Sequence, residues 1–133
     1  MPAIEALLDT DVLVEVLRGR PAAISWLSSR PASAAGVPVI VWMELIQGAR
    51  DQRERDKIIN RLAPHSIVHL EAGDSQAASG WFAAYWLSHT IGILDCPIAA
   101  IAVRLGAPLY TFNAAHFQVI PSLDVRSPYE RPR

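Results

Sequence analysis

Residues 7–14 read LLDTDVLV, and this stretch decides the fold. An apolar run over residues 4–8 ends at Asp9 and Asp11, and a second apolar run follows them. The pattern predicts a buried strand that leads into a helix over residues 12–18, which Gly19 can end in a left-handed conformation. Burying a carboxylate without a partner costs several kcal/mol, so acids at this position indicate ligands for a cation.

Two more acids lie within apolar motifs. Glu44 lies in WMELIQGA, residues 42–49, and Asp95 lies in GILDCPIAAIA, residues 92–102. Together with Asp9 they place three carboxylates in three well-separated motifs of the chain. Carboxylate oxygens are the ligands that Mg²⁺ and Mn²⁺ prefer, so the three acids predict a hydrolytic metal site.

Strand and helix signals alternate around these motifs. This alternation predicts an α/β fold in three layers, with a central parallel sheet of four to five strands flanked by helices on both faces. The expected strands cover residues 4–8, 37–41, 66–70, 108–112 and 123–125. The expected helices cover residues 12–18, 21–30, a stretch from residue 42 with Glu44 in its first turn, a charged surface helix around 51–57, and residues 74–89 and 97–105.

The expected topology brings the acids together. Ligands of an open parallel sheet bind beyond the carboxyl ends of its strands, where Asp9 is expected. Residues 111–113 leave the fourth strand at the same edge. Glu44 and Asp95 are expected to begin helices, whose positive ends favour anions. All of these elements can therefore converge on one cleft.

Composition limits the alternatives. The chain has 133 residues, which suggests one domain over residues 1–133 with a flexible tail at 127–133. Twelve basic and 13 acidic side chains give no overall positive field, so any nucleic-acid binding must be local. A lone Cys96 excludes an internal disulfide framework. The start of the chain lacks the features of a signal peptide, and no membrane-spanning run is present, so we expect a cytoplasmic protein with no membrane partner.

The motifs form an ordered set that runs from residue 7 to about residue 128. Each piece alone is weak, whereas the ordered set is fairly specific. Its members are Leu8, Asp9, Thr10, Asp11, Leu13, Leu17, Arg18, Gly19, Glu44, Leu45, Gly48, Ala49, Asp95, Ile98, Ala99, Ala100, Ala102, Gly106, Thr111, Phe112, Asn113, His116, Phe117 and Ile120.

This set resembles the PIN-domain ribonucleases, and most closely the VapC-type toxins of bacterial toxin–antitoxin pairs. The resemblance implies a PIN-like fold, an Mg²⁺- or Mn²⁺-dependent endoribonuclease, an RNA substrate and a cognate VapB-like antitoxin. It also implies that Asp9, Glu44 and Asp95 are the catalytic metal ligands and that the products carry 5′-phosphate and 3′-hydroxyl ends. The supporting residues would be Asp11, Thr111 and Asn113, and the candidates for binding the RNA backbone are Arg18, Arg20, Arg50 and Arg104.

The chain departs from the family pattern at two places. Many members carry a fourth carboxylate in the last motif, where this chain has Asn113 and His116. Fewer negative charges weaken a second metal site, so we expect one metal ion. Pro38 and Val41 stand where hydroxyl residues usually cap the helix of Glu44. The missing cap is worth about 1 kcal/mol and predicts a less rigidly held Glu44.

Each candidate also has a simpler explanation. Asp9 or Asp95 could be a plain helix cap, and for Asp11 we expect capping rather than direct metal ligation. Turn chemistry alone could explain Thr111 and Asn113. An aromatic face of residues 81–86 is most simply core packing, although part of it could form a homodimer or antitoxin contact.

Two other functions remain open from the residues. One is a catalytically degenerate PIN-like protein that binds RNA or a partner without cleaving. The other is a haloacid-dehalogenase-type phosphatase, which also uses an Asp-x-Asp motif like that of Asp9 and Asp11. That chemistry needs a downstream lysine and a later acidic pair, yet Lys57 is the only lysine and no adjacent acids follow it. The phosphatase is therefore the weaker alternative.

Overall fold

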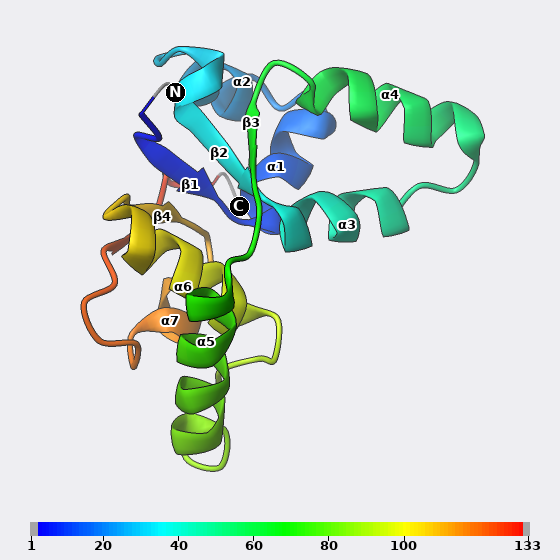
Figure 1. Ribbon diagram of the computed structural model, residues 1–133. Coiled ribbons are helices and arrows are strands. Elements are labelled where there is room, and N and C mark those ends of the chain that lie inside the picture. The colour runs from blue at the N-terminus through cyan, green and yellow to red at the C-terminus, as the bar shows by residue number, and fades with distance from the viewer. Residues whose placement is uncertain (1–2, 132–133) are drawn as a thin grey trace.

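A computed structural model describes residues 3–131, and within this range five strands form one parallel sheet in the order β3-β2-β1-β4-β5 (Figure 1). The predicted α/β class and its parallel sheet are confirmed. The strands are β1 (Ala6–Leu8), β2 (Ala35–Pro38), β3 (Ser66–Val68), β4 (Leu109–Tyr110) and β5 (Val125–Arg126).

Helices cover both faces of the sheet. Figure 1 shows α1, α2 and α4 on one side and α5, α6 and α7 on the other, which gives the predicted three layers. The helices are α1 (Thr10–Leu17), α2 (Pro21–Leu27), the 3₁₀ turn η1 (Ala32–Ala34), α3 (Val39–Gln47), α4 (Gln52–Leu62), α5 (Ala72–Tyr85), α6 (Asp95–Leu105) and α7 (Ala114–Phe117).

The central strand β1 is apolar because it is covered on both faces. Leu7 pairs with Gly36 of β2 on one side and with Leu109 of β4 on the other, and its side chain is fully buried. Burying a leucine side chain contributes roughly 1.5–3 kcal/mol. The buried strand is therefore a fixed base for the residue that follows it, Asp9.

The start of α3 differs from the prediction. We expected a strand over residues 37–41, but β2 ends at Pro38 and α3 begins at Val39. Pro38 suits the position before a helix because its fixed φ and missing N–H end the strand pairing, and burial of Val41 in the core overrides its strand propensity. Glu44 consequently lies in the second turn of α3 rather than the first. The missing cap is confirmed, since Pro38 makes no side-chain cap hydrogen bond.

The aromatic face is divided between core and surface. Trp81, Phe82 and Tyr85 pack partly buried against the core, as the simpler explanation expected. Trp86 stacks on Phe82 but leaves 55% of its surface exposed, and Leu87 beside it is 94% exposed. The predicted charged helix is α4, whose residues are largely exposed. Homodimer formation stays a prediction.

The last described residues return to the sheet. Within the range expected to be a flexible tail, Tyr129 packs edge-on against Phe112, with ring centroids 5.3 Å apart. Residues 132–133 lie outside the described part of the chain. Along residues 3–131 no helix is both long enough and apolar enough to cross a membrane.

Candidate active site

An acidic hollow opens at the carboxyl edge of the sheet. Five carboxylates line it, together with two arginines, and its volume of about 590 Å³ is within the usual range of ligand sites. The three acids predicted as metal ligands all belong to this lining. The lining residues are Asp9, Thr10, Asp11, Val14, Glu15, Arg18, Glu44, Gly92, Ile93, Leu94, Asp95, Asn113 and Arg131.

Asp9 is held by its two neighbouring elements. It is the N-cap of α1, and its Oδ1 accepts a hydrogen bond from the Thr10 backbone N–H at 2.8 Å. The buried Thr111 hydroxyl, just after β4, donates to Oδ2 at 2.8 Å. The cap explanation therefore holds for Asp9, but the cap does not account for its carboxylate lining an acidic hollow.

Asp11 does not have the expected capping role. It lies inside α1, and its Oδ2 accepts hydrogen bonds from the Phe112 backbone N–H at 3.0 Å and from Asn113 Nδ2 at 3.2 Å. The cap position is taken by Asp9, because α1 begins two residues earlier than predicted. Asp11 instead ties α1 to the loop after β4, and this tie brings Thr111 and Asn113 to the site.

Asp95 begins α6, as predicted, and closes a small turn. Its Oδ2 accepts a hydrogen bond from the Gly92 backbone N–H at 2.8 Å. A Cβ at position 92 would lie 3.0 Å from the same oxygen, which is closer than ordinary contact. Gly92 therefore allows the loop to approach the carboxylate and hold it in place.

Burial and neighbouring negative charges oppose the ionisation of the carboxyl groups in the hollow. Burial raises the pKa of Asp9 to about 6, and the charges of Asp11 and Asp95 add to this effect against the hydrogen bonds from Thr111 and Thr10. Burial also raises the pKa of Asp11, and it raises the pKa of Glu44, to which the charge of Asp95 contributes. Like charges thus crowd together here, an arrangement that favours the binding of a cation.

The donor set suits a hard divalent cation. Every acid in the hollow offers oxygen, and Asp11 Oδ1 is buried without a hydrogen-bond partner among the described residues. Within residues 3–131, as the fold places them, no group of three or more His, Cys, Asp or Glu side chains could hold a metal ion by itself. An ion at this site would therefore need ligands besides these carboxylates, such as water and substrate oxygens, as Mg²⁺ commonly does.

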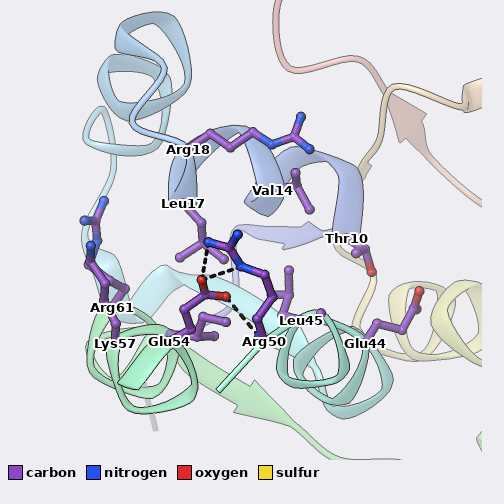
Figure 2. A pocket seen from close by; sticks show the side chains of 12 residues that line it. Thr10, Val14, Leu17, Arg18, Glu44, Leu45, Arg50, Glu54, Lys57 and Arg61 are labelled. Atoms are coloured by element: carbon purple, nitrogen blue, oxygen red, sulfur yellow. Dashed lines mark hydrogen bonds and ion pairs between the residues drawn. The ribbon is translucent and has the colours of Figure 1, made fainter. Parts of the chain in front are cut away.

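A second, more basic hollow adjoins the acidic one and shares Thr10, Val14, Arg18 and Glu44 with it. Figure 2 shows it between α1 and the helices α3 and α4, with Lys57 and Arg61 reaching in from α4. Arg50 also lines it, in an ion pair with Glu54.

Only two of the four arginines predicted to bind the RNA backbone lie at these hollows. Arg18 and Arg50 lie at the two hollows, whereas Arg20 and Arg104 line neither. Arg104 instead binds the buried Asp74, with Nε 2.9 Å from Oδ1. The sequence reasoning missed Glu15 and Arg131, both of which line the acidic hollow. The signal for Arg131 was available, because a strand parallel to β4 must end at the edge where the site lies.

The fold is a parallel α/β sheet whose carboxyl edge gathers acids from the end of β1 and from α1, α3 and α6. The chain belongs to the PIN-domain family, whose model, described as "PIN domain", matches residues 6–121. The resemblance to VapC-type PIN proteins is confirmed, and the phosphatase alternative is set aside.

Among curated proteins, the chain is similar to Ribonuclease VapC10 of Mycobacterium tuberculosis, with 34% identity over 131 residues that span 96% of this chain and 98% of the relative. It is also similar to Ribonuclease VapC19 of the same organism, with 30% identity over 127 residues that span 92% and 98%.

Among solved structures, it resembles a chain of a toxin–antitoxin complex from Klebsiella pneumoniae, with a TM-score of 0.78, 26% identity, and coverage of 95% of this chain and 99% of that one. A chain of DNA-bound VapBC from Salmonella typhimurium shares the fold, with a TM-score of 0.78 at 18% identity and coverage of 95% and 99%.

Proposed function

We propose that this protein is a metal-dependent endoribonuclease that acts as the toxin of a VapBC-type toxin–antitoxin pair. The observation that carries the proposal is the gathering of Asp9, Glu44 and Asp95 around one hollow in a PIN-domain chain. Both curated relatives are named as ribonucleases, which supports the activity. The solved toxin–antitoxin complexes support a VapB-like antitoxin as the partner.

The three carboxylates would hold Mg²⁺ or Mn²⁺ through their oxygens. A bound divalent cation would supply the Lewis acidity that cleavage of a phosphodiester needs. Among the described lining residues of the hollow there is no serine, cysteine or histidine that could act as the nucleophile. Water is therefore the expected nucleophile, and the products would carry 5′-phosphate and 3′-hydroxyl ends.

Other residues of the hollow orient the ligands. The Thr111 hydroxyl fixes one oxygen of Asp9, and the Gly92 N–H fixes one oxygen of Asp95. Asp11 keeps Asn113 at the rim through the hydrogen bond from its side-chain amide. These contacts limit the rotation of the carboxylates, and partners of this kind commonly change metal affinity or activity by about 10- to 100-fold.

The test is cleavage of RNA by purified protein with Mg²⁺ or Mn²⁺. We expect Asp95→Asn to lower the cleavage rate by more than about 100-fold, because removing a ligand costs more than removing a partner that orients it. Asp56→Asn is the matched control, since Asp56 is an exposed acid on α4 that pairs with Arg55 outside the hollow. The control variant should cleave like the wild type.

Two results would contradict the proposal. Cleavage that persists after chelation of all divalent metal would reject the metal mechanism, and an Asp95→Asn protein with the wild-type rate would reject the residue assignment. For the toxin role, expression of the wild-type chain alone should arrest growth, whereas expression of Asp95→Asn should not. A wild-type protein that binds RNA but never cleaves it would support the degenerate alternative.

A further inference from the structure

The parallel direction of β5 brings the C-terminal segment to the acidic hollow. Strand β5 pairs with β4 in parallel, with Leu109 opposite Val125 and Tyr110 opposite Arg126. Both strands therefore end at the same edge, where residues 111–113 lead away from β4 and residues 127–131 lead away from β5. The chain needs only five residues beyond Arg126 to place Arg131 in the lining of the hollow.

Arg131 is held there by two kinds of contact. Its guanidinium lies over the ring of Phe112, 4.2 Å from the centroid, and Tyr129 packs edge-on against the same ring. Its Nη1 lies 3.6 Å from Oε1 of Glu15 on α1. Stacking on an aromatic ring fixes the plane of a guanidinium while leaving its N–H groups available to a further partner.

The position of Arg131 suits a negatively charged ligand at the rim. The ion pair with Glu15 is long, and the Arg131 side chain keeps 47% of its surface exposed. The only other arginine among the described lining residues is Arg18, from the first turn beyond α1. The two cations flank a hollow with five carboxylates, which by themselves would repel the phosphates of an RNA strand.

We propose that Arg131 is a phosphate-binding residue that holds the RNA backbone beside the acidic centre. This inference rests on the proposed ribonuclease function and adds a substrate contact supplied by the C-terminal segment. The planar guanidinium offers two parallel N–H groups to the oxygens of one phosphate, a geometry that an ammonium group does not provide. Phe112 sets the plane of the guanidinium, and Glu15 limits how far it moves from the hollow.

The experiment compares Arg131→Gln and Arg131→Lys with the control Arg55→Gln. Arg55 is a close match because its side chain is 45% exposed and forms an ion pair with Asp56, although Arg55 lines neither hollow. We expect Arg131→Gln to lower kcat/KM for RNA cleavage by about 10- to 100-fold, the equivalent of one charge-assisted hydrogen-bond pair. Arg131→Lys should recover part of this loss, and Arg55→Gln should cleave like the wild type.

A binding measurement separates a phosphate contact from a structural role. With Ca²⁺ in place of Mg²⁺, a fluorescein-labelled pool of short random RNA should bind Arg131→Gln more weakly at low salt. The slope of log affinity against log salt concentration should also fall by about 1, as expected for one lost phosphate contact. The thermal unfolding midpoint should stay the same, because an exposed ion pair contributes little to stability.

The outcomes distinguish this inference from the function on which it rests. A wild-type protein that cleaves no RNA with either metal would overturn both. A wild-type protein that cleaves, together with an Arg131→Gln variant of equal kcat/KM and salt slope, would overturn only the role of Arg131. Faster cleavage by Arg131→Gln would also overturn this role, because the segment would then block the site. Equal losses in Arg131→Gln and Arg55→Gln would overturn it as well, because the loss would not be specific to position 131.

Discussion

Two buried aspartates, Asp74 and Asp9, lie in opposite electrostatic environments. Asp74 lies in the first turn of α5 and is 2% exposed, with both carboxylate oxygens within 3.0 Å of Nε of Arg104. Asp9 is 8% exposed, and its neighbours include the like-charged Asp11 and Asp95 rather than a paired cation. Asp74 also accepts a hydrogen bond from the Glu71 backbone N–H in a capping box.

The difference teaches how to separate a structural acid from a functional one. A cation from the chain itself balances Asp74, so this acid joins α5 to the C-terminal end of α6. The carboxylate of Asp9 is balanced only by hydrogen bonds, and its raised pKa records the cost. A buried carboxylate without a paired cation is tolerated when a bound ligand compensates its charge. The oxygen ligands of the hollow indicate a divalent cation.

The largest expected effect on stability is at the structural acid. Asp74→Asn removes the charge that faces Arg104 and should lower the free energy of unfolding by about 3 kcal/mol, the low end for a broken buried ion pair because the Arg104 side chain is 28% exposed. Urea unfolding measures this change. Below the unfolding transition the variant should still cleave RNA, because Asp74 lies outside the hollow.

Asp124→Asn is the control for this comparison. Asp124 pairs with Arg126 at 2.8 Å, but both side chains are about half exposed, so its loss should cost less than about 1 kcal/mol. Equal destabilisation by the two substitutions would show that burial of the pair is not what matters. A loss of cleavage in the folded Asp74→Asn protein would remove the distinction between structural and functional acids.

A smaller effect should appear in the pH dependence of the metal-free protein. Asp9 has a pKa of about 6 in the fold against an ordinary value of 3.8. Between these values the folded protein retains a proton that the unfolded chain has released, so the free energy of unfolding falls as the pH rises. The fall should be roughly 2–3 kcal/mol. Asp11 and Glu44, whose pKa values are also raised, act in the same direction.

Asp9→Asn tests the origin of this slope. Asparagine cannot ionise, so the variant should lose most of the pH dependence in this window and should be more stable than the wild type at neutral pH without metal. Saturating Mg²⁺ should reverse the wild-type trend, because a cation binds the ionised carboxylates and stabilises the fold more as the pH rises. Urea unfolding from pH 4 to 8 measures the slope, and an Asp9→Asn profile as steep as that of the wild type would show that Asp9 is not its origin.

The sequence brings the three candidate acids to one edge of the sheet, as the structure does, but it misplaces one of the elements that present them. Asp9 could be located because β1 is a short buried run whose end is unambiguous, and a parallel sheet gathers its sites at one edge. Glu44 was given the wrong turn of α3, because β-branched residues 39–41 favour a strand until burial in the core decides for a helix. A local pattern carries no information on such long-range burial.

The contacts of Asp11 and Arg104 could not be predicted from the sequence either. Asp11 binds Phe112 and Asn113 about 100 residues away in the chain, and Arg104 binds Asp74, 30 residues away. Either contact depends on how the elements pack, so an acid after a strand or an arginine on a helix gives no sign of it. The parallel pairing of β5 with β4 brings Arg131 to the hollow, and the predicted fifth strand of a parallel sheet was the one signal for it.

The smallest expected effect on stability comes from adding a negative charge to the acidic hollow. Asn113→Asp supplies the carboxylate that many family members carry in the last motif. It would lie beside Asp11, whose Oδ2 accepts a hydrogen bond from the Asn113 amide at 3.2 Å in the present chain. Without metal the two like charges should lower the free energy of unfolding by up to about 1 kcal/mol, since position 113 is exposed. With Mn²⁺ the variant should gain more stability than the wild type, and calorimetry should detect a second ion where the wild type binds one. Asp74 should bind no metal, because Arg104 already balances its charge. An Asn113→Asp protein that responds to Mn²⁺ like the wild type would therefore mean that Asn113 lies outside the reach of the metal.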